Sequence, residues 1–239
     1  MTEQRLQKVL AAAGVDSRRK CEELILDGVV RVNRKLVDKL PAFVDPEKDF
    51  ITVNGKKIRP ARKVYFLLNK PKGVICTNYD PQGRKKAIDL VNISERIFCV
   101  GRLDADTTGL IILTNDSELA NRLTHPRYEL AKTYVVRVKG EIAPEQIEKV
   151  KRGIWLAEGK TGRASVKILR RGHKESMLEV TIRQGLNRQV RRMLAKIGLP
   201  VKSLTRTQIG KLTTQGLGVG KFKILTGAEV DYLKKAAAD

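Results

Sequence analysis

Histidine and cysteine are scarce in this chain of 239 residues, which has two histidines and three cysteines. His125 and His173 cannot build a zinc site with thiols that lie so far apart in the sequence. Cys21, Cys76 and Cys99 are odd in number and show no Cys-x-x-Cys spacing, which indicates reduced thiols rather than a disulfide framework. We therefore expect no metal site, and we expect a cytoplasmic location.

Long apolar runs are also missing. No stretch approaches the roughly 18 apolar residues that a membrane span requires. The first residues, Met-Thr-Glu-Gln-Arg-Leu, lack the apolar region of a secretory signal. With 41% hydrophobic and 31% charged residues, the chain has the composition of a globular protein that can bury a core. We expect neither membrane insertion nor secretion.

Acidic residues are the third shortage, with 26 of them against 48 lysines and arginines, a net charge of +22. Residues 1–60 carry a net +4 and the remainder a net +18, so most of the excess lies in the C-terminal part. Such an excess favours a polyanion, and nucleic acid is the obvious candidate. An anionic membrane surface is the alternative, but it calls for a basic amphipathic helix or a lipidation motif that the sequence does not show.

The first 60 residues have the pattern of a small module with two helices. Apolar residues recur at helical spacing over 3–13, and a glycine, Gly14, ends the run. Asp16 or Ser17 is a suitable N-cap for a second helix that ends at Gly28. Short strands are expected over 29–32 and 51–56.

This order resembles the S4 RNA-binding domain. The resemblance rests on residues 5–10, Gly14, 17–20, 23–25 and 28–33, and it departs at Arg34, where the family usually has glycine. It implies that Arg18, Arg19 and Lys20, which open the second helix, contact RNA. The plain alternative is a solvated helix face. A polar linker over 60–63 sets the expected boundary between an S4-like domain at 1–60 and a larger domain at 61–239.

The larger domain has more expected strands than helices and no regular alternation of the two. This pattern predicts an α+β domain with a mixed, mainly antiparallel sheet flanked by helices. The expected strands are 64–68, 111–113, 133–138, 164–169 and 177–182, and the expected helices are 117–123, 144–153 and one that follows Asn187.

A loop just before the apolar run 111–113 carries the first candidate site residue, Asp104. Loops held by rigid strands often carry chemistry. The plain alternative is that Asp104, Asp106, Thr107 and Thr108 only shape a turn. Asp104 and Asp106 could also hold Mg²⁺ for phosphoryl transfer, but no phosphate-binding loop lies nearby in the sequence.

A basic segment over 183–194 is the second candidate. Asn187 is a fair N-cap for a helix that buries Val190, Met193, Leu194 and Ile197. Helical geometry then directs Arg188 and Arg192 away from the core, toward RNA phosphates. Arg191 lies on the flank, where it could reach inward and pair with a carboxylate.

These segments together resemble the ribosomal RNA pseudouridine synthases that have an N-terminal S4 domain. The resemblance covers nearly the whole chain and rests on residues 69–73, 101–110, 132–134, 187–194, Leu204 and Gly210. It implies that Asp104 is the catalytic carboxylate, Tyr134 stacks on the target base, Arg191 pairs with Asp104, and Leu204 contacts the base. We further expect Arg102, Gln189 and Lys70 to contact RNA.

The implied chemistry suits these residue types. Isomerising uridine breaks the C1′–N1 bond, turns the base and rejoins it through C5, which needs one carboxylate and no cofactor. A base within RNA must first be flipped out of its stack, and an aromatic wall favours it by about 1–3 kcal/mol. The resemblance implies ribosomal RNA, free or in an assembling subunit, as the partner, and we expect a monomer.

Three readings stay open from the sequence. An S4-domain RNA-binding or ribosome-assembly protein without catalysis would explain the charge, but not Asp104, Tyr134 and Arg191 together. A metal-dependent nuclease would need more clustered carboxylates. For a pseudouridine synthase, the run 115–123 favours the large-subunit branch, and a small-subunit target is the alternative.

Overall fold

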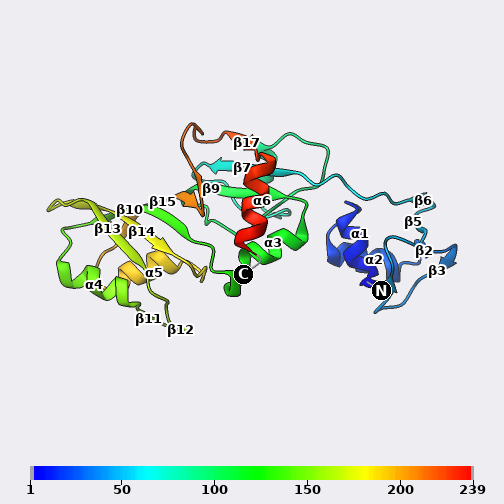
Figure 1. Cartoon of the computed structure of the whole chain (residues 1–239), viewed down its shortest axis with the longest axis horizontal. Coiled ribbons are helices and arrows are strands. Elements are labelled where there is room, and N and C mark those ends of the chain that lie inside the picture. The colour runs from blue at the N-terminus through cyan, green and yellow to red at the C-terminus, as the bar shows by residue number, and fades with distance from the viewer. Residues whose placement is uncertain (1–2, 238–239) are drawn as a thin grey trace. The chain divides into compact units, whose positions relative to one another are not determined.

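The computed structural model describes residues 3–237, and the chain divides into two compact units (Figure 1). One unit contains the chain up to Val64 together with Ile93–Ile97 and Asn115–Ser117, and the other contains the remainder. Over residues 3–237, no helix has both the length and the apolar character that crossing a membrane requires.

The N-terminal unit is built from two helices and short strands. Helix α1 (Leu6–Ala12) and helix α2 (Arg18–Leu26) confirm the two predicted helices, and Ser17 caps α2 by accepting a hydrogen bond from the Lys20 N–H at 3.2 Å. The strands form a four-stranded sheet in the order β3-β2-β5-β6 and a separate pair, β1 with β4. Their bounds are β1 Gln4–Arg5, β2 Val30–Val32, β3 Lys35–Leu36, β4 Phe43–Val44, β5 Ile51–Val53 and β6 Lys56–Lys57.

The turn between β2 and β3 contains Arg34 where the S4 family usually has glycine. Asn33 and Arg34 both adopt positive φ, 50° and 69°. Positive φ at both central residues is the geometry of the tight hairpin turn that matches strand twist. Arg34 therefore changes the residue at this turn and not the hairpin.

The second unit is organised around a nine-stranded sheet whose main path runs β13-β14-β10-β15-β9-β7-β17, with β16 beside β15 and β8 beside β9. Its pairs are antiparallel except for β15 with β9, which confirms the mixed, mainly antiparallel sheet. The bounds are β7 Tyr65–Lys70, β8 Phe98–Cys99, β9 Thr107–Thr114, β10 Lys132–Lys139, β13 Ser165–Arg170, β14 Glu175–Ile182, β15 Val201–Ile209, β16 Leu212–Thr213 and β17 Phe222–Ile224. A small hairpin, β11 (Trp155–Leu156) with β12 (Gly159–Lys160), stands apart from this sheet.

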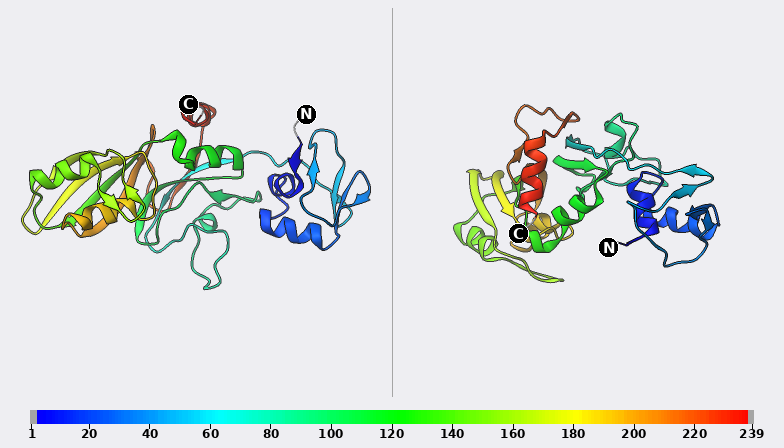
Figure 2. Two further views of the ribbon diagram at one scale, coloured as in Figure 1. Left: turned by 90° about the horizontal axis from the view of Figure 1, so that it is seen from below. Right: turned by 45° about the vertical axis from the view of Figure 1, so that its right-hand side comes forward.

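Four helices of the second unit pack against the sheet or lie beside its strands. Helix α3 (Ser117–Thr124) and helix α6 (Gly227–Ala236) lie on one side of β7 and β9, as Figure 2 shows. Their apolar residues form one core with the strands, made of Leu119, Leu123, Val230 and Leu233 against Leu67, Leu110 and Ile112. Helix α4 (Pro144–Arg152) lies beside β13, and helix α5 (Gln189–Lys196) lies beside β15. Two short 3-10 helices, η1 (Ala87–Leu90) and η2 (Pro126–Tyr128), complete the described elements.

The parallel pair of β9 and β15 depends on a glycine. Gly109 lies opposite Arg206 in the ladder, and a Cβ added at Gly109 would lie 2.2 Å from the Arg206 carbonyl oxygen. Only glycine allows the strands to approach so closely. The same pairing sets Leu204 opposite Thr107, so β15 carries Leu204 and Arg206 next to the loop that precedes β9.

Candidate active site

Asp104 lies in a tight turn immediately before β9. The Thr107 N–H donates to the Asp104 carbonyl at 3.1 Å, and the Gly73 N–H donates to the Ala105 carbonyl at 2.7 Å. The loop after β7 therefore holds this turn from behind. The Asp104 side chain is 29% exposed, so its carboxylate is open to a ligand.

A pocket of about 370 Å³ opens beside Asp104. We call it the Asp104 pocket; it is walled by the loop before β9, by β10 and β15, and by the loop that leads into α5. Tyr134 on β10 is 8% exposed and Leu204 on β15 is 6% exposed, and both line it. Asp104, Tyr134 and Leu204, which the resemblance placed in one site, therefore line the same pocket.

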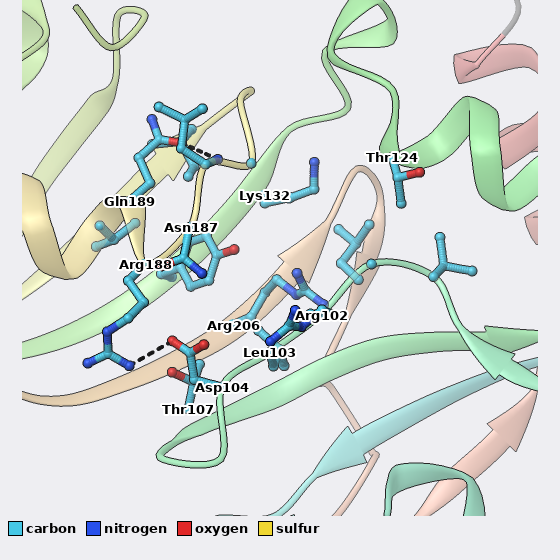
Figure 3. Close-up of a pocket in the computed structure, with 18 of the residues that line it drawn as sticks. Arg102, Leu103, Asp104, Thr107, Thr124, Lys132, Asn187, Arg188, Gln189 and Arg206 are labelled. Carbon is cyan, nitrogen blue, oxygen red and sulfur yellow. Dashed lines mark hydrogen bonds and ion pairs between the residues drawn. The ribbon is translucent and has the colours of Figure 1, made fainter. Parts of the chain in front are cut away.

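The arginine that meets Asp104 is Arg188, not Arg191. Arg188 Nη1 donates to Asp104 Oδ2 at 3.0 Å and lies 3.5 Å from Asp106 Oδ1 (Figure 3). The predicted Asp104–Arg191 contact is therefore wrong in this structure. The reason is local: Arg188, rather than Asn187, is the N-cap of α5, and its φ of 47° takes it out of the helix and toward the Asp104 turn.

Arg191 does reach inward from the flank of α5, as predicted, but toward a different carboxylate. Its Nη2 lies 2.9 Å from Asp106 Oδ2, and it also donates to the Asp106 carbonyl at 3.3 Å. A third contact runs to Thr107 Oγ1 at 3.5 Å. The side chain is 11% exposed, so Arg191 ties α5 to the turn that carries Asp104.

Lys70 is not placed to contact RNA, contrary to our expectation. It is fully buried, and its Nζ donates to the carbonyls of Pro71 and Val74 at 3.0 and 2.7 Å. Burial lowers the pKa of Lys70, and the charges of Cys76, Asp106 and Asp104 oppose that shift. Lys70 therefore holds the loop after β7, and that loop contacts the Asp104 turn through Gly73.

The other expected RNA contacts differ in how accessible they are. Arg102 is exposed at the Asp104 pocket, whereas Gln189 is buried and accepts from the Leu186 N–H at 3.1 Å, so it holds the loop before α5. Arg192 forms two contacts with Glu158, at 2.8 and 2.5 Å, and these hold the pKa of Glu158 at about 2.

The basic cluster of α2 is accessible as expected. Arg18, Arg19 and Lys20 are all exposed, although Lys20 pairs with Glu23 at 2.6 Å. Both histidines lie outside the pocket: His125 accepts from the Arg127 N–H, and His173 is 95% exposed. Over residues 3–237, no group of three or more histidine, cysteine or acidic side chains has the arrangement of a metal site.

Two cations that the sequence analysis did not select also line the pocket. Arg206 on β15 is 4% exposed and donates from Nε to the Leu110 carbonyl at 2.7 Å. Lys132 begins β10 and donates from Nζ to the Leu130 carbonyl at 3.2 Å. Burial and the nearby charge of Arg206 lower the pKa of Lys132 to about 8. Arg206 shares a strand face with Leu204, two residues before it, but residues 201–209 show no alternation of apolar and polar side chains that would have marked it in the sequence.

The thiols of Cys76 and Cys99 contact each other next to the loop that carries Asp104. The Leu103 N–H donates to Cys76 Sγ at 3.4 Å. A hydrogen bond from the Cys99 thiol lowers the pKa of Cys76 to about 6, and the same contact raises the pKa of Cys99. All three cysteines are free, as expected, and Cys21 is buried in the N-terminal unit.

Comparison with known proteins gives consistent matches. The family model described as RNA pseudouridylate synthase matches residues 64–196, and the S4 domain model matches residues 4–50. The chain is 49% identical to "Ribosomal large subunit pseudouridine synthase B" of Bacillus subtilis, over 98% of this chain and 97% of that protein. It is 43% identical to an "Uncharacterized RNA pseudouridine synthase" of Aquifex aeolicus, over 99% of this chain and 96% of that protein.

A solved structure supports the same assignment. The crystal structure of a pseudouridylate synthase superposes with a TM-score of 0.70 at 28% identity, covering 96% of this chain and 99% of that one.

Proposed function

The chain belongs to the RNA pseudouridylate synthase family, and on that basis we propose that it isomerises one uridine of large-subunit ribosomal RNA to pseudouridine. The Bacillus subtilis relative, whose name states that activity on the large subunit, supports this choice of substrate. The net charge of +22 fits an RNA partner. We propose that the S4 domain recruits the RNA and that the second unit carries out the reaction.

One observation carries the proposal: a carboxylate, an aromatic ring and an apolar side chain meet at one pocket. We propose that a flipped uridine enters the Asp104 pocket, where Tyr134 stacks on the base and Leu204 packs on it. Asp104 would then act at C1′ of the sugar, as a nucleophile or as a stabilising charge, while the C1′–N1 bond breaks. Arg188 orients the carboxylate through its contact at 3.0 Å.

The first experiment tests the role of Asp104. We expect Asp104→Asn to lower pseudouridine formation by at least about 10³-fold while RNA affinity stays near that of the wild type, because the carboxylate acts in the reaction and not in binding. Asp106→Asn is the matched control, since Asp106 lies in the same turn and pairs with Arg191; its loss should stay below about tenfold. A comparable rate for Asp104→Asn and wild type would exclude Asp104 as the catalytic carboxylate.

The second experiment identifies the substrate. Pseudouridines would be mapped in both ribosomal RNAs from cells with and without this protein, and in deproteinised RNA treated with the purified enzyme. We expect one large-subunit uridine to lose its modification and to regain it with the enzyme. Loss of a small-subunit pseudouridine instead would refute the large-subunit assignment and leave the family assignment intact.

A further inference from the structure

One nitrogen of a buried arginine at the Asp104 pocket lacks a hydrogen-bond partner among residues 3–237. The guanidinium of Arg206 uses Nε for the Leu110 carbonyl, and its Nη2 is enclosed with no partner among residues 3–237. A buried donor on a charged group is seldom left unpaired, because its lost hydration is not compensated. The arrangement suits a group whose partner arrives with the substrate.

The pocket also holds an excess of positive charge. Its charged lining comprises one carboxylate, Asp104, and four cations, Arg102, Lys132, Arg188 and Arg206. Arg188 is occupied by Asp104. Lys132 and Arg206 are close enough that the charge of Arg206 acts on Lys132. Figure 3 shows both of these side chains along the pocket, with Arg188 turned to Asp104.

We propose that Arg206, assisted by Lys132, stabilises the negative charge that develops on the carbonyl oxygens of the target uracil when its glycosidic bond breaks. This inference rests on the proposed function. It gives two residues outside our sequence-based site a role in the chemical step rather than in RNA binding.

The charge balance of the reaction requires such a group. When the C1′–N1 bond breaks, its electron pair stays on the base, and the resulting anion shares its charge among N1, O2 and O4. Asp104 forms a bond to C1′ or balances the positive charge there. The base then turns and C5 bonds to C1′, which releases Asp104; C5 loses its proton and N1 gains one. Preorganised donors at the atoms that become negative are the usual device for lowering such a barrier.

The position of Arg206 favours the base over the RNA backbone as its partner. Arg206 lies opposite Tyr134 in the ladder of β15 with β10, and it shares its strand with Leu204. Phosphate contacts come from cations on the protein surface. At 4% exposed, Arg206 can reach only a group that enters the pocket, and the flipped uracil is that group.

The first test separates chemistry from binding. Arg206→Met and Arg206→Lys would be assayed in the full chain for kcat and KM with the mapped RNA. We expect Arg206→Met to lower kcat by about 10²-fold with KM changed less than about threefold, and Arg206→Lys to recover part of kcat. Arg137→Met is the matched control, because Arg137 on β10 is exposed and paired with Glu175 at 2.7 Å; it should behave as wild type. An unchanged kcat, or a loss confined to KM, would overturn the proposal.

A second test does not depend on the folding of the methionine variant. RNAs carrying 2-thiouridine or 4-thiouridine at the target weaken one carbonyl acceptor at a time. We expect the rate effect of one sulfur substitution to shrink at least about threefold in Arg206→Lys relative to wild type, because the contact it weakens is already altered. Independent effects for both sulfur positions would argue against a contact between Arg206 and the base.

The pH profile tests Lys132. Because its pKa is about 8, its cation is present below that pH and is lost above it, so kcat/KM of the wild type should fall above pH 8. In Lys132→Arg the fall of kcat/KM should move to higher pH. Lys132→Met should have a low kcat/KM that does not fall near pH 8. Ionisation of the uracil affects wild type and both variants equally, so it does not produce a difference among them. An unchanged pH for the fall of kcat/KM in Lys132→Arg would refute this role.

Failure of the proposed function differs from failure of this inference. If wild type forms no pseudouridine in any ribosomal RNA, the proposed function fails. If wild type is active and Arg206→Met is equally active, only this inference is refuted.

Discussion

Gly109→Ala is the substitution whose cost the structure defines most directly. Gly109 has a φ of +103°, and a Cβ there would lie 2.2 Å from the carbonyl oxygen and 2.7 Å from the nitrogen of Arg206. These are backbone atoms of a paired strand, so no side-chain rotation can relieve the contact. Strand β15 must move away, and Leu204 and Arg206 move with it.

The expected destabilisation has two sources. Positive φ costs an L-residue about 1–2 kcal/mol. Forcing extra volume into a packed region costs about 1–3 kcal/mol. The free energy of unfolding should therefore fall by about 2–5 kcal/mol, which lowers the melting temperature by roughly 5–20 °C for a domain of this size.

Thermal melting followed by circular dichroism measures this effect, and Gly140→Ala supplies the control. Gly140 has a similar φ of +87°, but a Cβ there meets nothing within 4 Å, so that variant isolates the backbone term. We also expect kcat of Gly109→Ala to fall, because β15 carries three of the residues that line the pocket, Leu204, Arg206 and Ile209. Equal melting temperatures for the two alanine variants would show that β9 and β15 do not approach as described.

Two further predictions concern the arginines. Arg191→Met should lower the free energy of unfolding by about 1–3 kcal/mol, because Arg191 is 11% exposed and makes three contacts to the Asp104 turn. Arg188→Met should change the free energy of unfolding by less than about 1 kcal/mol and should mainly lower kcat. If Arg191→Met instead lost more kcat than Arg188→Met and kept its melting temperature, Arg191 would be the partner of Asp104 during catalysis. Replacing the exposed residues Arg18 and Arg19 by glutamine should weaken RNA binding and leave kcat at saturating RNA unchanged. The slope of log K for RNA binding against log salt concentration should become shallower by about 0.7–0.9 per lost phosphate contact. A slope equal to that of wild type would exclude α2 from the RNA interface.

Periodicity predicted the elements whose burial is one-sided. Helices α1, α2, α3 and α4 and strands β10 and β14 were all expected, because their apolar residues recur at helical or alternating spacing. Helix α6 was missed although its capping box, Thr226 with Glu229, was readable in the sequence. Strand β15 was missed because Lys202, Arg206 and Gln208 interrupt its apolar pattern, and only the structure shows that Arg206 is a buried residue.

The pairing of charges could not be predicted in the same way. Residues 188, 191 and 192 are all arginines, so a shift of one residue in the start of α5 decides which of them contacts Asp104. Arg188 takes a left-handed backbone conformation that its residue type does not favour, and no local pattern announces it. Lys70 was misassigned for a related reason: a lysine in a polar loop is typical of a surface, and its burial follows from carbonyls that fold back around it.

The electrostatics of the pocket bear on why the fold keeps costly groups buried there. A site built only to hold RNA phosphates would gain most from exposed cations, which the chain has in abundance outside the pocket. Arg206 is instead buried and Lys132 half-buried; the pKa of Lys132 falls to about 8, and Nη2 of Arg206 has no hydrogen-bond partner among residues 3–237. That arrangement is unfavourable in the free enzyme and becomes favourable once negative charge forms beside it. Because an interaction accelerates a reaction only when it is stronger in the transition state than before it, buried cations awaiting an anionic base are better placed for catalysis than for affinity.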